Sequence, residues 1–438
     1  MSKPKTTSYV FIPGKNWKLS LAELLSFLEA KTYDSRITDL SKSHFTFAGE
    51  ELPTDSCIDE LGGIIKIGRI ITCIPSGTII EAFLHAKEEA RTEIKSKLSS
   101  DPAFEEIFRV SPEKRVFGVS SYFENPSFRR VSKIAQRFLG NHIKKAFAVH
   151  GIKARFMGFP KKRKLPQLTN VEVLKKELIE KSVEILLCIG EKQTIIAKTM
   201  AIHNPFEFQK RDIGRPVQRK IFSIPPRLAR IMVNLSLCSH GKVLLDPFCG
   251  VGTFLQEAVL TKAQAIGVDV NPWCVEASNK NLEWLKSEYG LINARYRVKL
   301  GNTRKLTEQV SEETVDCITT EPDLGPALRH IPTVHYASRI VDALKPLYYG
   351  FLGEAYKVLK NGGRLVFVSP YVRTRVGDFI TLDVEERARA LGFRVVPLFR
   401  KEAFAEDHRL VRSLVETEGL IEIGKRHKIG RRIHVLQK

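Results

Sequence analysis

One short segment in the second half of the chain, Leu244–Phe254, constrains the fold more than any other. An apolar run ends at Asp246, and a turn containing Gly250 and Gly252 follows and opens a helix. A strand that leads through a glycine turn into a helix is the first unit of a doubly wound parallel sheet. Throughout residues 226–438, short apolar strands alternate with amphipathic helices in the same rhythm. The sequence therefore predicts a Rossmann-type α/β domain there, with a mostly parallel sheet.

The residues around this turn indicate which ligand it can hold. Glycines let the backbone approach a ligand closely, and the helix that begins at Thr253 offers free N–H groups. Leu255 stands where a dinucleotide site would have its third glycine, and Asp246 would repel a pyrophosphate. A carboxylate instead suits the ammonium and sulfonium groups of S-adenosylmethionine. The pattern therefore favours S-adenosyl-L-methionine over NAD as the cofactor.

Three further positions are expected to face the ligand, because ligands bind at the carboxyl ends of the strands in such sheets. Asp269 ends the second strand and can bond ribose hydroxyls. Asn302 follows the third strand and is either an adenine contact or an ordinary turn residue. The fourth strand ends at Glu321-Pro322-Asp323-Leu324-Gly325, so this loop should face the transferable methyl group.

The first half of the chain reads as two smaller α/β units and two connecting segments. Residues 1–78 have the order β-α-β-β-α-β, which is that of a ferredoxin-like fold. A helical connector follows over 79–109, with one charged helix at about Ile80–Leu98. Residues 110–202 form a second unit, and residues 203–225, which contain three prolines and one glycine, are predicted as a linker.

The positive charge of the chain is concentrated in one region. Residues 126–235 hold 24 Lys and Arg against 7 Asp and Glu, so they carry +17 of the formal net charge of +21. A localised basic field indicates a polyanionic partner, most often nucleic acid, whereas solubility alone would not require the charge to gather in one segment. The candidate RNA contacts are Arg129, Arg130, Lys133, Lys144, Lys145, Arg155, Lys161, Lys162, Arg163 and Lys164. The segment Lys425–Arg432 could add a contact near the active site.

Several other features exclude whole classes of protein. The seven cysteines are scattered, and no pair has C-x-x-C spacing, which argues against a disulfide framework or a metal site. No apolar run reaches the roughly 18 residues that a membrane span needs, and the N-terminus lacks the apolar region of a secretory signal. We therefore expect a cytoplasmic protein without metal or membrane contact, and nothing indicates an auxiliary subunit.

Two motifs carry a resemblance to a known family. Asp246-Pro-Phe-Cys-Gly-Val-Gly-Thr resembles the first motif of amino-group methyltransferases. Arg211-Asp-Ile-Gly-Arg-Pro, followed by Ile224-Pro-Pro-Arg-Leu-Ala-Arg, is similar to the entry into that domain in THUMP-domain tRNA guanosine N2-methyltransferases. Their layout of a ferredoxin-like, a THUMP and a methyltransferase domain matches the three predicted units. The resemblance implies methylation of the N2 amine of a tRNA guanosine, at position 10 or less often position 6. It also implies that Asp246, Gly250, Gly252 and Asp269 bind the cofactor, and Phe248, Thr253 and Asn302 complete the candidate cofactor-binding residues.

The chain departs from this family at the end of the fourth strand. The family usually has Asp or Asn, two prolines, an aromatic residue and glycine, whereas this chain has Glu321-Pro322-Asp323-Leu324-Gly325. The candidate catalytic residues are Glu321, Pro322, Asp323 and Gly325. Glu321 would accept one N–H of the target amine and the backbone carbonyl near Pro322 another, although Asp323 could be the working carboxylate instead.

Two other functions fit parts of the sequence. The catalytic domain alone permits a DNA adenine or cytosine amino-methyltransferase, but the THUMP-like middle unit argues against it. The altered fourth-strand motif would suit an RNA-binding homologue that has lost catalysis. The intact Asp246, Gly250, Gly252 and Asp269 argue against that alternative, because an inactive protein need not keep a cofactor site.

Overall fold

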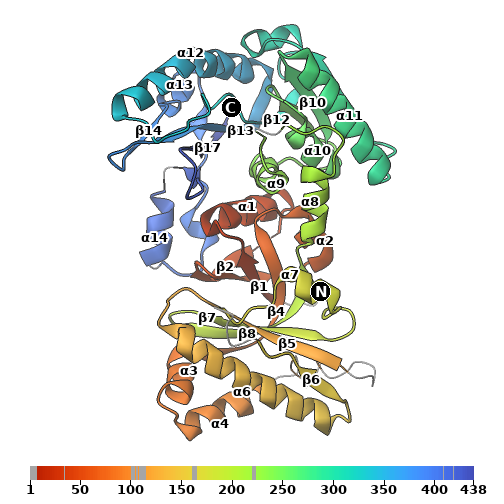
Figure 1. The fold of residues 1–438 in the computed structure, drawn as a ribbon, viewed down its shortest axis with the longest axis vertical. Coiled ribbons are helices and arrows are strands. Elements are labelled where there is room, and N and C mark those ends of the chain that lie inside the picture. Colours follow the sequence, from red (N-terminus) through yellow and green to blue (C-terminus); the bar gives the residue numbers. More distant parts are fainter. Residues whose placement is uncertain are drawn as a thin grey trace, which may run out of the picture.

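Two β-sheets organise the protein, one in each half of the chain (Figure 1). The computed structural model describes residues 7–438 apart from residues 34, 100–103, 105–106, 108–114, 160–164, 220–222, 408 and 418. The sheet of the N-terminal half lies in the lower part of Figure 1 and the sheet of the C-terminal half at its upper end. Within the described residues, no helix combines the length and the apolar character that a membrane span requires.

The first six elements follow the predicted β-α-β-β-α-β order. They are β1 (Thr7–Pro13), α1 (Trp17–Ala30), β2 (Ser35–Ser41), β3 (His44–Gly49), α2 (Thr54–Glu60) and β4 (Ile64–Pro75). The side chain of Asn16 caps the first turn of α1 by accepting the Leu19 N–H. The strands pair antiparallel in the order β2-β3-β1-β4, which is the arrangement of a ferredoxin-like sheet.

The N-terminal sheet continues beyond β4 into the second unit. Its further elements are β5 (Arg115–Phe123), α6 (Phe128–Val149), β6 (Ala154–Phe156), α7 (Asn170–Lys175), β7 (Val183–Ile189) and β8 (Gln193–Ile202). Because β4 pairs with β8, the two units share one eight-stranded sheet. The predicted domain boundaries, and the interpretation of residues 110–202 as a THUMP domain, stay predictions.

A buried ion pair crosses this shared sheet. The Nζ of Lys66, on β4, lies 2.5 Å from Oε1 of Glu184, on β7, and both side chains are at most 1% exposed. The hydroxyls of Ser120 and Thr199 also donate to the Glu184 carboxylate, and Lys66 donates to the Leu168 carbonyl. The ammonium of Lys66 and the carboxylate of Glu184 thus both have hydrogen-bond partners besides each other. These bonds offset the free-energy cost of burying the two charges.

The prediction of a single connector helix was wrong. The chain forms two helices, α3 (Ser76–Phe83) and α4 (Glu88–Ser99), and turns between them at Ala86, whose φ is +57°. Apolar side chains from both helices, including Ile79 and Ile94, join one buried cluster with β5 and α6. One straight helix could not have brought both apolar stripes to that cluster. The predicted linker likewise contains a helix, α8 (Pro205–Ile213), which the sequence analysis did not assign.

The C-terminal half forms the predicted doubly wound, mostly parallel sheet. Its elements are α9 (Pro226–Leu235), β9 (Val243–Asp246), α10 (Thr253–Leu260), β10 (Gln264–Asp269), α11 (Pro272–Glu288), β11 (Tyr296–Leu300), η1 (Thr303–Glu308), β12 (Val315–Thr320), α12 (Val334–Val358), β13 (Leu359–Arg373), β14 (Phe379–Thr381), α13 (Glu385–Ala390), β15 (Arg394–Val395), η2 (Lys401–Ala403), α14 (Arg409–Val415), β16 (Leu420–Glu422) and β17 (Ile429–Gln437). The strand order is β11-β10-β9-β12-β13-β17-β15. The first five of these strands run parallel, and β17 inserts antiparallel to β13. The chain order reverses between β9 and β12, and ligands bind at such a switch point.

The two halves are joined where α1 packs against α9. The buried carboxylate of Glu23, on α1, accepts the N–H groups of Gly62 and Gly63 and the side-chain amide of Asn234, on α9. Burial raises the pKa of Glu23 to about 7 despite these three hydrogen bonds. The N-terminal sheet is therefore held against the C-terminal domain by specific polar contacts as well as by apolar packing.

Candidate active site

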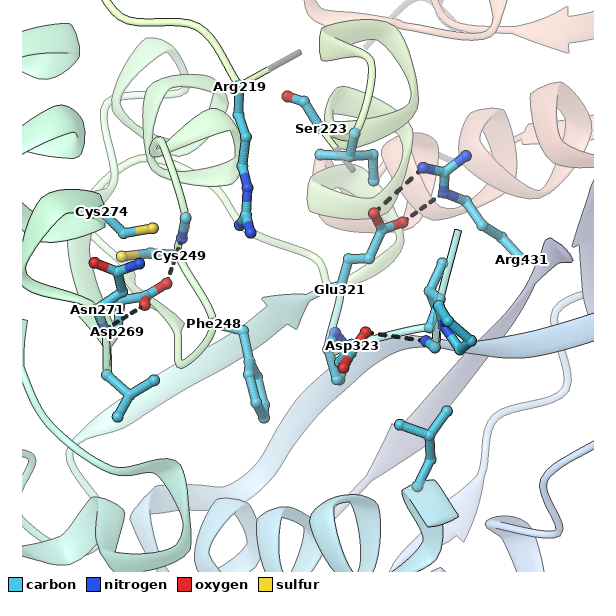
Figure 2. A pocket seen from close by; sticks show the side chains of 18 of the residues that line it. Arg219, Ser223, Phe248, Cys249, Asp269, Asn271, Cys274, Glu321, Asp323 and Arg431 are labelled. Atoms are coloured by element: carbon cyan, nitrogen blue, oxygen red, sulfur yellow. Dashed lines mark hydrogen bonds and ion pairs between the residues drawn. The ribbon is translucent and has the colours of Figure 1, made fainter. Parts of the chain in front are cut away.

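A cavity of about 880 Å³ opens at the carboxyl ends of β9, β10 and β12 (Figure 2). These strands end at Asp246, Asp269 and Thr320, and the loop after β12 carries Glu321 and Asp323. Because the three strands are parallel neighbours, the side chains that follow them reach the same edge of the sheet. The volume lies within the roughly 300–1,000 Å³ that small-molecule sites occupy.

The glycine turn after β9 forms one wall of this cavity. Gly250 has a φ of +53° and Gly252 a φ of +82°, a backbone region that other residues adopt only with strain. A Cβ atom added at Gly250 would meet no atom within 4 Å, so the backbone there faces open space. The carboxylate of Asp269 accepts the Gly250 N–H and the Asn271 N–H, both at 2.9 Å. These bonds fix the orientation of Asp269 beside the turn.

Asp246 is a buried carboxylate at the floor of the cavity. Its Oδ1 accepts the Thr320 hydroxyl at 2.6 Å and the Phe248 N–H at 3.1 Å. Burial raises the pKa of Asp246 to about 7; the negative charges of Asp269 and Glu321 add to this effect, and the two hydrogen bonds reduce it. A cationic ligand in the cavity would favour the ionised form of this group.

The loop after β12 is held from two sides. The guanidinium of Arg431, on β17, donates from Nε to Glu321 at 2.5 Å and from Nη2 at 3.2 Å, so the ion pair is bidentate (Figure 2). Arg431 also donates to Glu422 at 3.2 Å. On the other side, the Asp323 carboxylate accepts the Gly325 N–H at 2.9 Å, and the Tyr348 hydroxyl lies 3.0 Å from the Asp323 carbonyl.

The structure brings most of the predicted site residues together. The predicted residues that line the cavity are Asp246, Phe248, Gly250, Thr253, Asp269, Glu321, Pro322, Asp323 and Gly325. Gly252 does not line it, and a Cβ there would meet Ser278 at 3.1 Å. Asn302 also lies outside the lining; its side chain accepts the Arg304 N–H at 3.0 Å, as the turn interpretation predicts.

The lining also includes residues that were not predicted as site residues, among them Arg219, Tyr336, Arg339 and Arg431. Arg431 belongs to a strand that the sequence analysis missed, although the segment that contains it was expected near the active site. Tyr336 and Arg339 lie on the first turns of α12. The helical spacing of apolar residues along Val334–Val358 is the sequence signal that could have identified this helix and the side that faces the cavity. In the described part of the chain, no group of three or more His, Cys, Asp or Glu could hold a metal ion.

The candidate RNA contacts that the structure describes lie far from this cavity. Five of them, Arg129, Arg130, Lys133, Lys144 and Lys145, are exposed along α6, and Arg155 is exposed on β6. Lys161, Lys162, Arg163 and Lys164 lie outside the described residues. Figure 1 places α6 at the opposite end of the long axis from the C-terminal sheet. One ligand that contacts both α6 and the cavity must therefore be an extended molecule.

Comparisons with known proteins agree with this geometry. A family model described as an RMKL-like methyltransferase domain matches residues 215–376. The tRNA (guanine(10)-N2)-dimethyltransferase of Methanocaldococcus jannaschii is 27% identical over 366 residues, which cover 82% of this chain and 89% of the relative. A probable tRNA (guanine(10)-N2)-dimethyltransferase of Methanothermococcus thermolithotrophicus is 34% identical over 33% of this chain and 79% of the relative. The crystal structure of TrmN from Thermus thermophilus shares the fold, with a TM-score of 0.51 and 14% identity over 99% of this chain and 100% of that one.

Proposed function

Because the chain belongs to the family of tRNA (guanine(10)-N2)-dimethyltransferases, we propose that it methylates the N2 amine of guanosine 10 in tRNA. The observation that carries this proposal is the cavity at the switch point of the sheet, where Asp246 and Asp269 share one space with Glu321. The names of the relatives lead us to expect two methyl groups on that amine. All seven cysteines are free thiols, which suits the reducing cytoplasm, where we place the protein.

S-adenosylmethionine fits the residues present, and when bound it would supply an electrophilic methyl group. The open space at Gly250 and the N-terminus of α10, which begins at Thr253, would receive the cofactor. Asp269 would accept ribose hydroxyls with the lone pairs that its two backbone hydrogen bonds leave free. Asp246 would face the cationic part of the cofactor.

The loop after β12 would hold the target amine. The N2 lone pair of guanine is delocalised into the ring, so the protein must orient the amine rather than activate the methyl donor. Glu321 would accept one N–H and the backbone carbonyl near Pro322 the other, and the carboxylate could take the proton that the amine loses. Glu321 is proposed as the working carboxylate because it stands where the family has Asp or Asn, while Asp323 accepts the Gly325 N–H within the loop. The bidentate pair with Arg431 fixes the direction in which Glu321 points.

The exposed basic face of α6 would bind the RNA backbone at a distance from the reaction. We propose that Arg129, Arg130, Lys133, Lys144, Lys145 and Arg155 contact phosphates, together with the run Lys161, Lys162, Arg163 and Lys164. Contacts of this kind read RNA shape more than base sequence. A folded tRNA is long enough to reach from α6 to the cavity, whereas a small substrate is not.

Cofactor binding should depend on pH because of Asp246. Its pKa of about 7 means that half of the carboxyl groups are protonated at neutral pH in the free protein. A cationic cofactor prefers the ionised form, so affinity should fall as the pH falls below 7, by up to about tenfold per unit. Isothermal titration with S-adenosylmethionine between pH 5.5 and 7.5 would measure this slope. In Asp246→Asn the slope should vanish; an equal slope in the two proteins would exclude Asp246 as its source.

The proposed function is tested by methyl transfer with purified protein. Unmodified tRNA transcript and, in a parallel reaction, duplex DNA are incubated with S-adenosylmethionine, digested and analysed by nucleoside mass spectrometry. We expect N2-methylguanosine and N2,N2-dimethylguanosine. Binding of S-adenosylmethionine without any methylated guanosine would contradict the proposal and favour the RNA-binding homologue, and methylated adenosine or cytosine in DNA would favour the DNA enzyme.

A further inference from the structure

One face of α12 forms the wall of the cavity opposite the glycine turn. The side chains that line the cavity from this helix are Tyr336, Arg339, Ile340, Ala343 and Leu344. Their spacing of three, four, seven and eight residues places them on one stripe of the helix. The inner part of the stripe supports the loop after β12, since a Cβ at Gly325 would come within 2.8 Å of Ile340.

The outer end of this stripe has a different character. Tyr336 is 45% exposed although it lines the cavity, and Arg339, one turn further along, is also exposed. An aromatic ring that is exposed and also lines the cavity can contact a bound ligand with its apolar face and its hydroxyl. The two side chains lie at the entrance of the cavity, beside the loop that carries Glu321.

Tyr336 differs from the other aromatic side chains of the cavity. Phe254 is only 3% exposed and belongs to the core. The ring of Phe248 packs edge-on against Phe351, with a centroid separation of 5.4 Å. Of the aromatic residues that line the cavity in the described chain, Tyr336 alone offers an exposed ring face to a ligand.

The arginines of the cavity differ in whether their charges are already paired and in which wall carries them. Arg431 is committed to Glu321 and Glu422. Arg219 is exposed and makes no ion pair in the described part of the chain, but it lies on the wall that carries Cys274 and Asp269, whereas Arg339 lies on α12 one turn from Tyr336. Arg339 makes no ion pair within the described residues. Its charge is therefore available to an anion that approaches the entrance of the cavity.

We propose that Tyr336 stacks on the target guanine and that Arg339 binds the phosphate beside that nucleotide. This inference rests on the proposed function, because it names the residues that receive the RNA substrate at the same site. A base inside a folded RNA must leave its stack before an enzyme can reach its exocyclic amine, and an aromatic ring can replace the lost stacking. The apolar side chains that line the cavity from the loop after β12 are those of Pro322, Leu324, Pro326 and Ala327, none of which has a π face.

The stacking half of the inference is tested with Tyr336→Leu and Tyr336→Phe. Leucine keeps an apolar side chain but no π face, so tRNA affinity and kcat/KM should fall by roughly 10- to 100-fold, the equivalent of one stacked base. Phenylalanine keeps the ring and should restore both values. His335→Ala is the matched control, because His335 is exposed on the same turn but does not line the cavity. Titration with S-adenosylmethionine should give wild-type affinity for all three variants.

The phosphate half is tested by the salt dependence of tRNA binding. In Arg339→Ala the slope of log K against log salt should fall by about 0.7–0.9, the value of one lost phosphate contact. Arg297→Ala, which removes an exposed arginine from β11, should keep the wild-type slope.

Failure of this inference can be told apart from failure of the proposed function. If the wild-type protein methylates guanosine and Tyr336→Leu binds and turns over tRNA equally well, stacking on Tyr336 is wrong and the function stands. If the wild-type protein transfers no methyl group, the function is wrong, and the affinities of Tyr336→Leu and Tyr336→Phe still decide whether the ring binds RNA. An unchanged salt slope in Arg339→Ala overturns the phosphate contact.

Discussion

Replacing Glu321 by alanine should lower the turnover of tRNA methylation by about 10²–10³, the size of effect seen when one pre-organised polar group is removed from an active site. The loss should appear in kcat, while the affinities for tRNA and S-adenosylmethionine change little, because the contact to the amine matters mainly in the transition state. Glu321→Gln keeps an acceptor oxygen and should retain part of the activity. Single-turnover transfer of labelled methyl groups measures the chemical step directly.

Asp323→Ala is the control for this prediction. The Asp323 carboxylate bonds the Gly325 N–H within the loop, so its loss should have a smaller effect than the loss of Glu321. If Asp323→Ala abolishes turnover and Glu321→Ala does not, the two carboxylates have exchanged the roles assigned above. If neither change affects an active enzyme, the loop does not hold the target amine.

Replacing Lys66 by methionine should destabilise the N-terminal sheet by about 3–5 kcal/mol, because it leaves the Glu184 carboxylate buried without its counter-ion. The midpoint of chemical denaturation, followed by circular dichroism, measures the loss. The double variant Lys66→Met/Glu184→Met removes both charges and should recover most of the stability, since two apolar side chains can replace a buried ion pair at little cost.

An exposed ion pair provides the matched control for Lys66. Lys181 and Glu177 pair at 2.7 Å on the surface, with side-chain exposures of 69% and 53%. Lys181→Met should change stability by less than about 1 kcal/mol. Equal effects at Lys66 and Lys181 would mean that the ion pair across β4 and β7 does not hold the shared sheet together.

The sequence predicted those parts of the structure that local patterns encode. The glycine turn after Asp246 and the alternation of strands and helices after residue 226 correctly predicted the parallel sheet, and most of the predicted site residues line the cavity at its carboxyl edge. The β-α-β-β-α-β order at the N-terminus was also predicted correctly, because apolar residues recur in each element with the spacing of a strand or of a helix. Asn302 was ambiguous, since the same residue type caps a turn and contacts a base.

The parts that were missed depend on contacts between distant residues. The strand β17 pairs with β13 across more than fifty residues of sequence, so its polar, basic start gave no local strand signal. The ion pair between Arg431 and Glu321 depends on the register of β17 against β13, so local sequence patterns could not predict it. The break at Ala86 follows from packing of α3 and α4 on one cluster, and helix propensity alone predicted that the helix would continue.

The most direct test of the account compares two tRNAs that differ by one exocyclic amine. A tRNA with guanosine at position 10 and the same tRNA with inosine at that position are incubated with the protein and labelled S-adenosylmethionine. Inosine lacks only the N2 amine, so shape, charge and stacking are preserved. We predict incorporation of up to two methyl groups into the guanosine tRNA and none into the inosine tRNA. Equal incorporation into both would contradict the claim that this protein methylates the N2 amine of guanosine 10.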